Sequence, residues 1–421
     1  MSEPAPRLRP VDAFPVEHEG QSCIALRDPA GYTDAVVLLP RVLLEIVSLF
    51  DGEHSIADIQ AAVMRRHGEL LPREQIQAVA DSLDAHGFLE SERFAARRAA
   101  VDGAFLEAPL RPAAHAGSAY PAEADALHAA LDACFAPPEG PGPADGRPAG
   151  APPVRAVIAP HIDFRRGGPA YAWAYRDVAE RADADVFVIL GTCHAGMADP
   201  FALTRKDYAS PLGPVAVDRD FVEALAARAR QDCFGSELAH RSEHSIEFQA
   251  VFLRYLFHGR RDVAIVPVLV SFAHEAMLRG QGPEADPRVP RFLEALAETA
   301  AASGRRVALV AGADLAHVGP RFGDPEPVSP ETLAWIGRED RALLEAVETG
   351  DPAAFYDAVA RDEDRRRICG FSPIYALLRA LGGGRGTVRR YGQWPDPQGV
   401  VTFASVVFPA RRGERDDGWA S

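Results

Sequence analysis

The sequence predicts an α/β protein with a mostly parallel or mixed central sheet and flanking helices, preceded by a small α+β domain of winged-helix-like type. Two observations predict this fold. Apolar runs rich in β-branched residues recur with helical patterns between them, which is typical of strands covered on both faces. A charged stretch and a Pro/Gly-rich stretch divide the chain. Its 421 residues are 47% hydrophobic, which is ample for two full-sized cores.

The larger domain is predicted from four strand-like runs. These are residues 154–160, 185–191, 263–270 and 306–312. Residues 167–182 form a helical pattern of the length that a βαβ crossover needs. A final run, VVTFASVVF at 400–408, is expected to add an edge strand.

The first hundred residues read as a separate small domain. Two short apolar runs flank DPAGYT and predict a hairpin, and three helical patterns follow, at 40–50, 55–68 and 72–87. The second helix is expected to be capped by Ser55. A DNA-binding domain of this kind would carry a basic recognition helix, whereas residues 1–100 hold 10 Arg against 16 Asp plus Glu. The pattern therefore favours a peptide-binding over a DNA-binding module.

The domain boundaries follow from composition. We expect a linker at 101–112, the larger domain at 113–410 with a flexible loop at 136–153, and a tail at 411–421.

The overall charge narrows the classes of partner. Forty-five basic and 60 acidic side chains give a net charge of −15, which argues against nucleic acid and against an anionic membrane. No run approaches the roughly 18 apolar residues of a membrane helix, and the first residues lack the apolar core of a signal peptide. Five scattered cysteines fit reduced thiols. These features predict a cytoplasmic protein.

Polar side chains that could bind a metal follow three of the predicted strands. His161 and His194 each follow a strand closely, and Asp314 and His317 follow a third. Ligands of α/β sheets bind at the carboxyl ends of the strands. The sequence therefore predicts one cleft, most simply around a single metal ion.

Two further segments could contribute to this cleft. Cys369 lies just before a predicted helix and follows three arginines, which should favour its thiolate. Thiolate with imidazole suits iron, copper or zinc. Residues 242–257 predict a helix capped by Ser242, in which His244 and Glu247 share a face. That face could line the cleft or meet solvent, and its spacing is not the HExxH of zinc proteases.

Taken together, residues 113–409 resemble the Memo-like family, which includes the bacterial proteins called AmmeMemoRadiSam system protein B. The resemblance rests on eight ordered blocks: HAGSAYP (115–121), APHIDF (159–164), LGTCHAG (190–196), SPLGPVAVD (210–218), EHSIEFQ (243–249), PVLV (267–270), GADLAHVGPRF (312–322) and ICGFSPI (368–374). The family fold is similar to that of the LigB-type class III extradiol dioxygenases.

The resemblance implies roles for individual residues. The family's metal ligands fall on His161, His194 and Cys369. Asp314 and His317 fall on a motif pair at the cleft, where a histidine in the dioxygenases acts as acid/base. Further cleft-lining positions of the family fall on His115, His244 and Glu247. We expect His115, Tyr120 and Asp163 to line the substrate pocket. Two departures concern the substrate: HIDF stands where many members have His-Ala-Gly-Tyr, which would put a carboxylate near the metal, and Ala119 stands where many have Trp.

The resemblance favours a non-haem iron(II) oxidoreductase that acts on an aromatic or peptide-borne substrate, with copper or zinc as alternative metals. His317, oriented by Asp314, would move protons, and His244 and Glu247 would position substrate or water. One alternative is a non-catalytic metal-binding adaptor that recognises a peptide or protein, and another is a zinc hydrolase with Glu247 or His317 as base.

The N-terminal domain resembles the PqqD-like family through its ALRDP, VVLLP and GFLES patterns. This resemblance implies a peptide or protein partner. Radical SAM and AMMECR-type proteins are the partners that the bacterial relatives imply.

Overall fold

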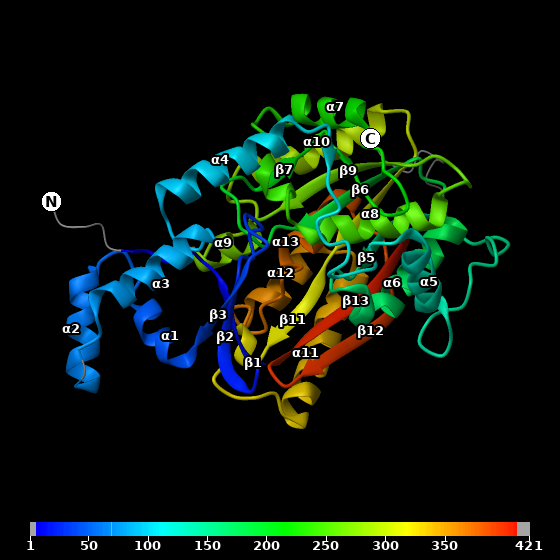
Figure 1. Cartoon of the computed structure of the whole chain (residues 1–421). Coiled ribbons are helices and arrows are strands. Elements are labelled where there is room, and N and C mark those ends of the chain that lie inside the picture. The colour runs from blue at the N-terminus through cyan, green and yellow to red at the C-terminus, as the bar shows by residue number, and fades with distance from the viewer. Residues whose placement is uncertain (1–5, 69, 411–421) are drawn as a thin grey trace. The chain divides into compact units, whose positions relative to one another are not determined.

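The computed structural model describes residues 6–68 and 70–410 and divides the chain into two compact units, Met1–Glu107 and Ala108–Ser421 (Figure 1). The linker expected at 101–112 is wrong over 101–107, because these residues end helix α4 (Glu92–Glu107). Phe94 and Phe105 are buried on this helix. They lie eleven residues apart, about three helical turns, and therefore share a face. The tail expected at 411–421 lies outside the described residues.

Over residues 6–68 and 70–107, the first unit contains a three-stranded antiparallel sheet and four helices. The expected hairpin is confirmed as strands β2 (Gln21–Arg27) and β3 (Val36–Pro40). Strand β1 (Asp12–His18) pairs with β2 and was not predicted. Helices α1 (Arg41–Ser48), α2 (Ile56–His67) and α3 (Arg73–Ala85) agree with the three helical patterns. Their apolar faces form one core with β2 and β3.

The second unit is built on an eight-stranded mixed sheet. Its centre is parallel, in the order β5-β10-β6-β9, and antiparallel strands extend it on both sides. The parallel strands are β5 (Val154–Ala159), β10 (Val307–Gly312), β6 (Val186–Thr192) and β9 (Ala264–Val270). The antiparallel strands are β7 (Phe201–Leu203), β11 (Asp314–Val318), β12 (Thr387–Asp396) and β13 (Gly399–Pro409). The predicted α/β class with a mixed central sheet is confirmed.

Strand β13 corrects the expectation of an edge strand at 400–408. It pairs with β12 on one side and with β5 and β11 on the other. Almost every residue of β13 is buried. The β12 hairpin covers the side that was expected to be exposed, so the run is an internal strand.

Helices flank the sheet in two groups (Figure 1). The first group contains α5 (Ala124–Phe135), α6 (Phe164–Arg181) and α8 (His244–Phe257). The second contains α9 (Ala273–Leu278), α10 (Arg288–Ala302), α11 (Pro330–Thr349), α12 (Pro352–Ala360) and α13 (Phe371–Leu381), and α7 (Arg219–Ala229) packs on α10. A short parallel pair, β4 (Leu110–Arg111) with β8 (Asp207–Tyr208), lies apart from the main sheet.

Two further expectations concern single segments. Residues 136–153 contain neither helix nor strand, as expected of a loop. Within residues 6–68 and 70–410, none of the helices combines the length and apolar character that crossing a membrane requires.

Candidate metal centre

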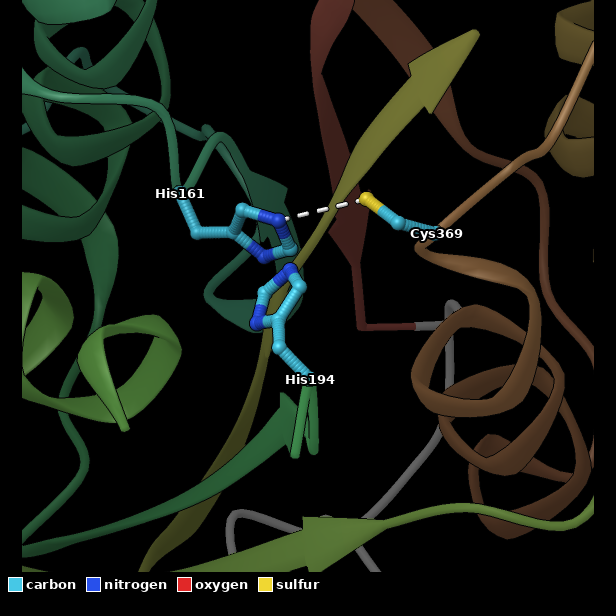
Figure 2. Close-up of side chains that lie close together, drawn as sticks. All are labelled: His161, His194 and Cys369. Carbon is cyan, nitrogen blue, oxygen red and sulfur yellow. Dashed lines mark hydrogen bonds between the residues drawn. The ribbon is translucent and has the colours of Figure 1, made fainter. Parts of the chain in front are cut away.

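Two imidazoles and one thiol meet at the carboxyl edge of the parallel strands. His161 follows β5, His194 follows β6, and Cys369 precedes α13. One donor atom from each of the three lies within 4.8 Å of the others, and Figure 2 shows the side chains converging from three separate segments. Sγ of Cys369 is 3.2 Å from Nε2 of His161. The expected gathering of strand-end side chains is therefore present in the fold.

The ring of His161 is held by the end of the neighbouring strand. Its Nδ1 lies 2.9 Å from the carbonyl oxygen of Gly312. A carbonyl only accepts, so Nδ1 carries the proton and the lone pair is on Nε2, the atom that faces Cys369. Residue 312 must be glycine here, because a Cβ would lie 2.4 Å from the carbonyl oxygen of Ser245.

The ring of His194 is held by a carboxylate that the sequence analysis did not single out. Its Nδ1 lies 2.9 Å from Oε1 of Glu243, and its backbone N–H donates to Oε2 at 2.7 Å. Glu243 is the N-cap of α8. The expected cap, Ser242, is wrong, because the longer carboxylate reaches the helix N–H groups. The available signal was an acidic residue directly before the apolar helix.

His244 faces this cluster from the first turn of α8. Its ring stacks on that of His194, with centroids 4.6 Å apart and planes at 18°. The rings of His161 and His115 lie 5.2 and 5.6 Å away. His194, Glu243 and His244 also offer donor atoms within 4.8 Å of one another.

Asp314 and His317 both lie on β11. Asp314 was expected to orient His317, but its hydrogen bond is to His161. Oδ1 of Asp314 accepts from the backbone N–H of His161 at 2.9 Å, and its Oδ2 lies 3.7 Å from Nε2 of that ring. Nδ1 of His317 is bonded instead to the carbonyl of Leu315, at 3.1 Å. A bulge between the two residues shifts the register. Asp314 therefore orients His161 and not His317.

Glu247, which was expected to line the cleft, has all of its hydrogen-bond partners in a buried cluster around Arg111. Its side chain is fully buried and forms an ion pair with Arg111. It also accepts from the backbone N–H groups of Ala114 and His115, at 3.2 and 3.0 Å, and from the hydroxyl of Tyr120. All of these partners belong to residues 111–120, at the start of the second unit, so Glu247 anchors that segment.

The three expected pocket residues also have local partners. Nε2 of His115 donates to the carbonyl of Ser242 at 2.9 Å, and Tyr120 is buried with its hydroxyl on Glu247. Asp163 caps α6, where it accepts from the backbone and the side chain of Arg166. Its carboxylate is thus engaged at the start of a helix, and the sequence alone did not reveal this competing use.

Burial and a neighbouring carboxylate govern the protonation of the donors. It lowers the pKa of His161 to about 3, so this imidazole is neutral. Burial also acts on His194, but the Glu243 carboxylate outweighs it and raises the pKa of that ring. Burial raises the pKa of Cys369 far above its ordinary value. The expected stabilisation of the thiolate by neighbouring arginines is wrong, because Arg366 pairs with Asp340 and Arg367 with Asp324.

The donor set fits a transition metal ion. Two imidazoles and a thiol suit iron, copper or zinc and do not suit the oxygen-binding Mg²⁺ or Ca²⁺. Each imidazole is anchored through its second nitrogen, as metal-ligating histidines usually are.

The fold and the cluster define an α/β protein with a His/Cys group at the carboxyl edge of its sheet. The chain belongs to the Memo-like family: the family model described as "Memo-like protein" matches residues 111–407. The curated relatives are named "MEMO1 family protein". The one from Aquifex aeolicus is 27% identical over 408 residues, which cover 96% of this chain and 99% of the relative. Those from Aeropyrum pernix and Methanosarcina mazei are 32% and 28% identical, and cover 72% and 71% of this chain and 99% and 98% of their own length.

Proposed function

We propose that the second unit is a metal-dependent oxidoreductase that holds one iron(II) ion through His161, His194 and Cys369. The observation that carries the proposal is the convergence of these three donors within 4.8 Å, with the second nitrogen of each imidazole anchored. A bound iron ion would supply a Lewis-acidic, redox-active centre for the reaction of dioxygen with an aromatic or peptide-borne substrate.

The surrounding side chains supply positioning and proton transfer. His244 and His317 are partly exposed beside the cluster and are not among its three donors. An imidazole can accept or donate a proton at either nitrogen. In this proposal His317 moves a proton to or from substrate, while His244 contacts substrate or water beside His194. Asp314 holds His161 in place through its backbone N–H.

The same geometry weighs against a zinc hydrolase that uses Glu247 as its base. Both oxygens of Glu247 already accept hydrogen bonds within the buried cluster around Arg111. A hydrolase would have to rely on His317 alone.

Metal analysis of protein purified without oxygen tests the proposal. We expect one equivalent of iron in the natural sequence, and loss of that equivalent in His161→Ala, His194→Ala and Cys369→Ala. His317→Ala should keep the metal and lose dioxygen consumption with candidate aromatic substrates. Retention of metal by all three ligand variants would overturn the metal site. Stoichiometric zinc with no dioxygen uptake would favour the hydrolase, and metal without any turnover would favour the adaptor.

A further inference from the structure

We infer that Glu243 is a positioning residue that fixes the tautomer of His194, so that the Nε2 lone pair of this ring is presented to the ion. The inference rests on the proposed metal site. It adds a residue whose role is to hold a ligand without binding the metal itself.

The hydrogen bonds of Glu243 carry the inference. Oε2 accepts from the backbone N–H of His194 at 2.7 Å, while Oε1 lies 2.9 Å from Nδ1 of the same residue. The carboxylate therefore holds His194 at two points, through backbone and ring. An acceptor that faces Nδ1 requires the proton to be there, which in the neutral ring leaves Nε2 unprotonated.

The same carboxylate is fixed to the start of α8. Oε1 also accepts from the backbone N–H groups of His244 and Ser245, at 2.9 and 3.1 Å. The carbonyl of Glu243 accepts in turn from Nη2 of the buried Arg111 at 2.7 Å. Glu243 is only 6% exposed. A helix end, a buried guanidinium and the loop after β6 thus determine where the carboxylate lies.

A second ion bound by His194, Glu243 and His244 is the competing interpretation, because these residues also form a compact donor group. Two features argue against it. Both carboxylate oxygens already accept from backbone N–H groups. The separation of 2.9 Å between Nδ1 and Oε1 is that of a hydrogen bond, whereas two ligands of one tetrahedral ion, at about 2.0–2.2 Å from it, would lie about 3.3 Å apart.

Glu243→Gln tests the inference, because glutamine preserves the shape but offers a single acceptor oxygen. The carboxylate accepts from four N–H groups, the backbone and Nδ1 of His194 at one side and the start of α8 at the other. The amide NH₂ must therefore face either the backbone N–H of His194, or Nδ1 together with the two N–H groups of α8. In the first arrangement a neutral amide oxygen replaces the carboxylate at Nδ1 and holds the proton there less strongly. In the second the NH₂ donates to Nδ1 and drives the proton to Nε2, the atom that should bind the ion.

Two measurements on the full-length chain report on this change. In metal-free protein labelled with ¹⁵N-histidine, the signals of His194, assigned by their absence in His194→Ala, should indicate Nδ1–H in the natural sequence and a larger Nε2–H population in Glu243→Gln. In an anaerobic Co²⁺ titration, the dissociation constant should rise about 10- to 100-fold. The Co²⁺ absorption spectrum should also change, with the stoichiometry still one.

Asp218→Asn is the matched control, because Asp218 is also a buried N-cap carboxylate, at the start of α7. It should lower the melting temperature to a similar extent and leave Co²⁺ binding unchanged. The inference is overturned if Glu243→Gln binds Co²⁺ as the natural sequence does, or if the natural sequence binds two ions and the variant one. Failure of the natural sequence to bind Co²⁺ would instead overturn the metal site, and the tautomer measurement would still decide the role of Glu243.

Discussion

At the scale of single residues, the cluster depends on groups that the sequence presents as ordinary helix residues. Glu243, the N-cap of α8, and Glu247, in its first turn, are four positions apart and both buried, yet their carboxylates have different partners. Glu243 holds the loop that carries His194, and Glu247 neutralises Arg111. Each carboxylate offsets the cost of its own burial with donors from a distant segment.

The Arg111–Glu247 pair gives the first prediction. Glu247→Gln leaves the guanidinium of Arg111 without its counter-charge in a site that is closed to water. We expect the free energy of unfolding to fall by about 3–5 kcal/mol, as measured by urea denaturation. Metal stoichiometry should be unchanged in the folded fraction. Glu294→Gln, at an exposed position of α10, serves as the control and should change stability little.

His240 gives a pH-dependent prediction. It is fully buried, with Nδ1 on the hydroxyl of Tyr208 and Nε2 on the carbonyl of Ala202. Burial, together with a smaller effect of the neighbouring Arg111, lowers its pKa to about 3, against the opposing effects of the bond to Ala202 and the charge of Glu243. Between pH 6.5 and 3 the unfolded chain therefore binds a proton that the folded chain does not. The free energy of unfolding is therefore not reduced by His240 above pH 6.5. Below pH 6.5 it falls by about 1.4 kcal/mol for each unit by which the pH is lowered.

His240→Gln isolates this contribution, since glutamine can still donate to Ala202 and accept from Tyr208. The free energy of unfolding, measured from pH 4 to 6, should depend on pH less steeply in this variant by about 1.4 kcal/mol per unit. His258→Gln, at an exposed position, is the control. Equal slopes in His240→Gln and the natural sequence would contradict the prediction.

At the scale of elements, local sequence signals set where several helices begin. Ser55 and Asp58 form a reciprocal capping box at the start of α2, in which each side chain accepts from the backbone N–H of the other residue. Gly68 ends the same helix in the left-handed conformation, at φ 73°. Both ends of α2 are therefore specified by the sequence of the helix itself and its flanking residues.

Removing the cap provides a prediction for this element. Ser55→Ala should lower the free energy of unfolding of the first unit by about 1 kcal/mol, because the N–H of Asp58 loses its acceptor. Ser48→Ala is the control, since the hydroxyl of Ser48 bonds a carbonyl in the last turn of α1 and caps no helix start. Thermal unfolding followed by circular dichroism measures both variants. Equal melting temperatures would show that the cap contributes nothing.

The elements that the sequence predicted are those whose pattern reflects burial. The continuous apolar runs of β5, β6, β9 and β10 marked buried strands within a residue or two. Strand β1 was missed because most of its residues are exposed and Pro15 interrupts it. Helix α4 was missed because its alanines and arginines obscured the two buried phenylalanines. A burial pattern in the sequence reveals a helix or strand only when a large share of its residues faces the core.

The site, like the fold, could be predicted only in part from the sequence. The topology of parallel strands brings His161 and His194 to one edge, and order along the chain is enough to infer this. The partners of Tyr120 and Glu247 depend on contacts between distant segments, whereas Asp163 is engaged locally as the N-cap of α6. Linear spacing contains no information about the long-range contacts, so the sequence could not show which partners Tyr120 and Glu247 have.

At the scale of the whole molecule, the two units differ in what they contribute. All three proposed metal ligands lie in the second unit. Relatives that match 71–72% of this chain do so over 98–99% of their own length. The relatives therefore do not all contain a counterpart of the first unit.

Deletion of residues 1–107 tests this division. We expect the remaining chain to keep its metal stoichiometry, because every proposed ligand and its anchoring partners remain. Any affinity for a peptide or protein partner that the first unit provides should be lost. Titration calorimetry on the truncated chain and on the intact chain measures this difference. A cut at residue 100 is the instructive comparison, since it leaves the last residues of α4 without the rest of their helix. Loss of metal on deletion of 1–107 would contradict the division.

The distance along the chain between the donors has a consequence for folding. His161 and Cys369 are 208 residues apart in sequence but have donor atoms 3.2 Å apart. An ion held between them would act as a removable cross-link that exists only in the folded chain. At a free concentration one hundred times its dissociation constant, it would add about 2.7 kcal/mol to the free energy of unfolding. The lifetime of the folded protein would then rise and fall with the supply of its metal.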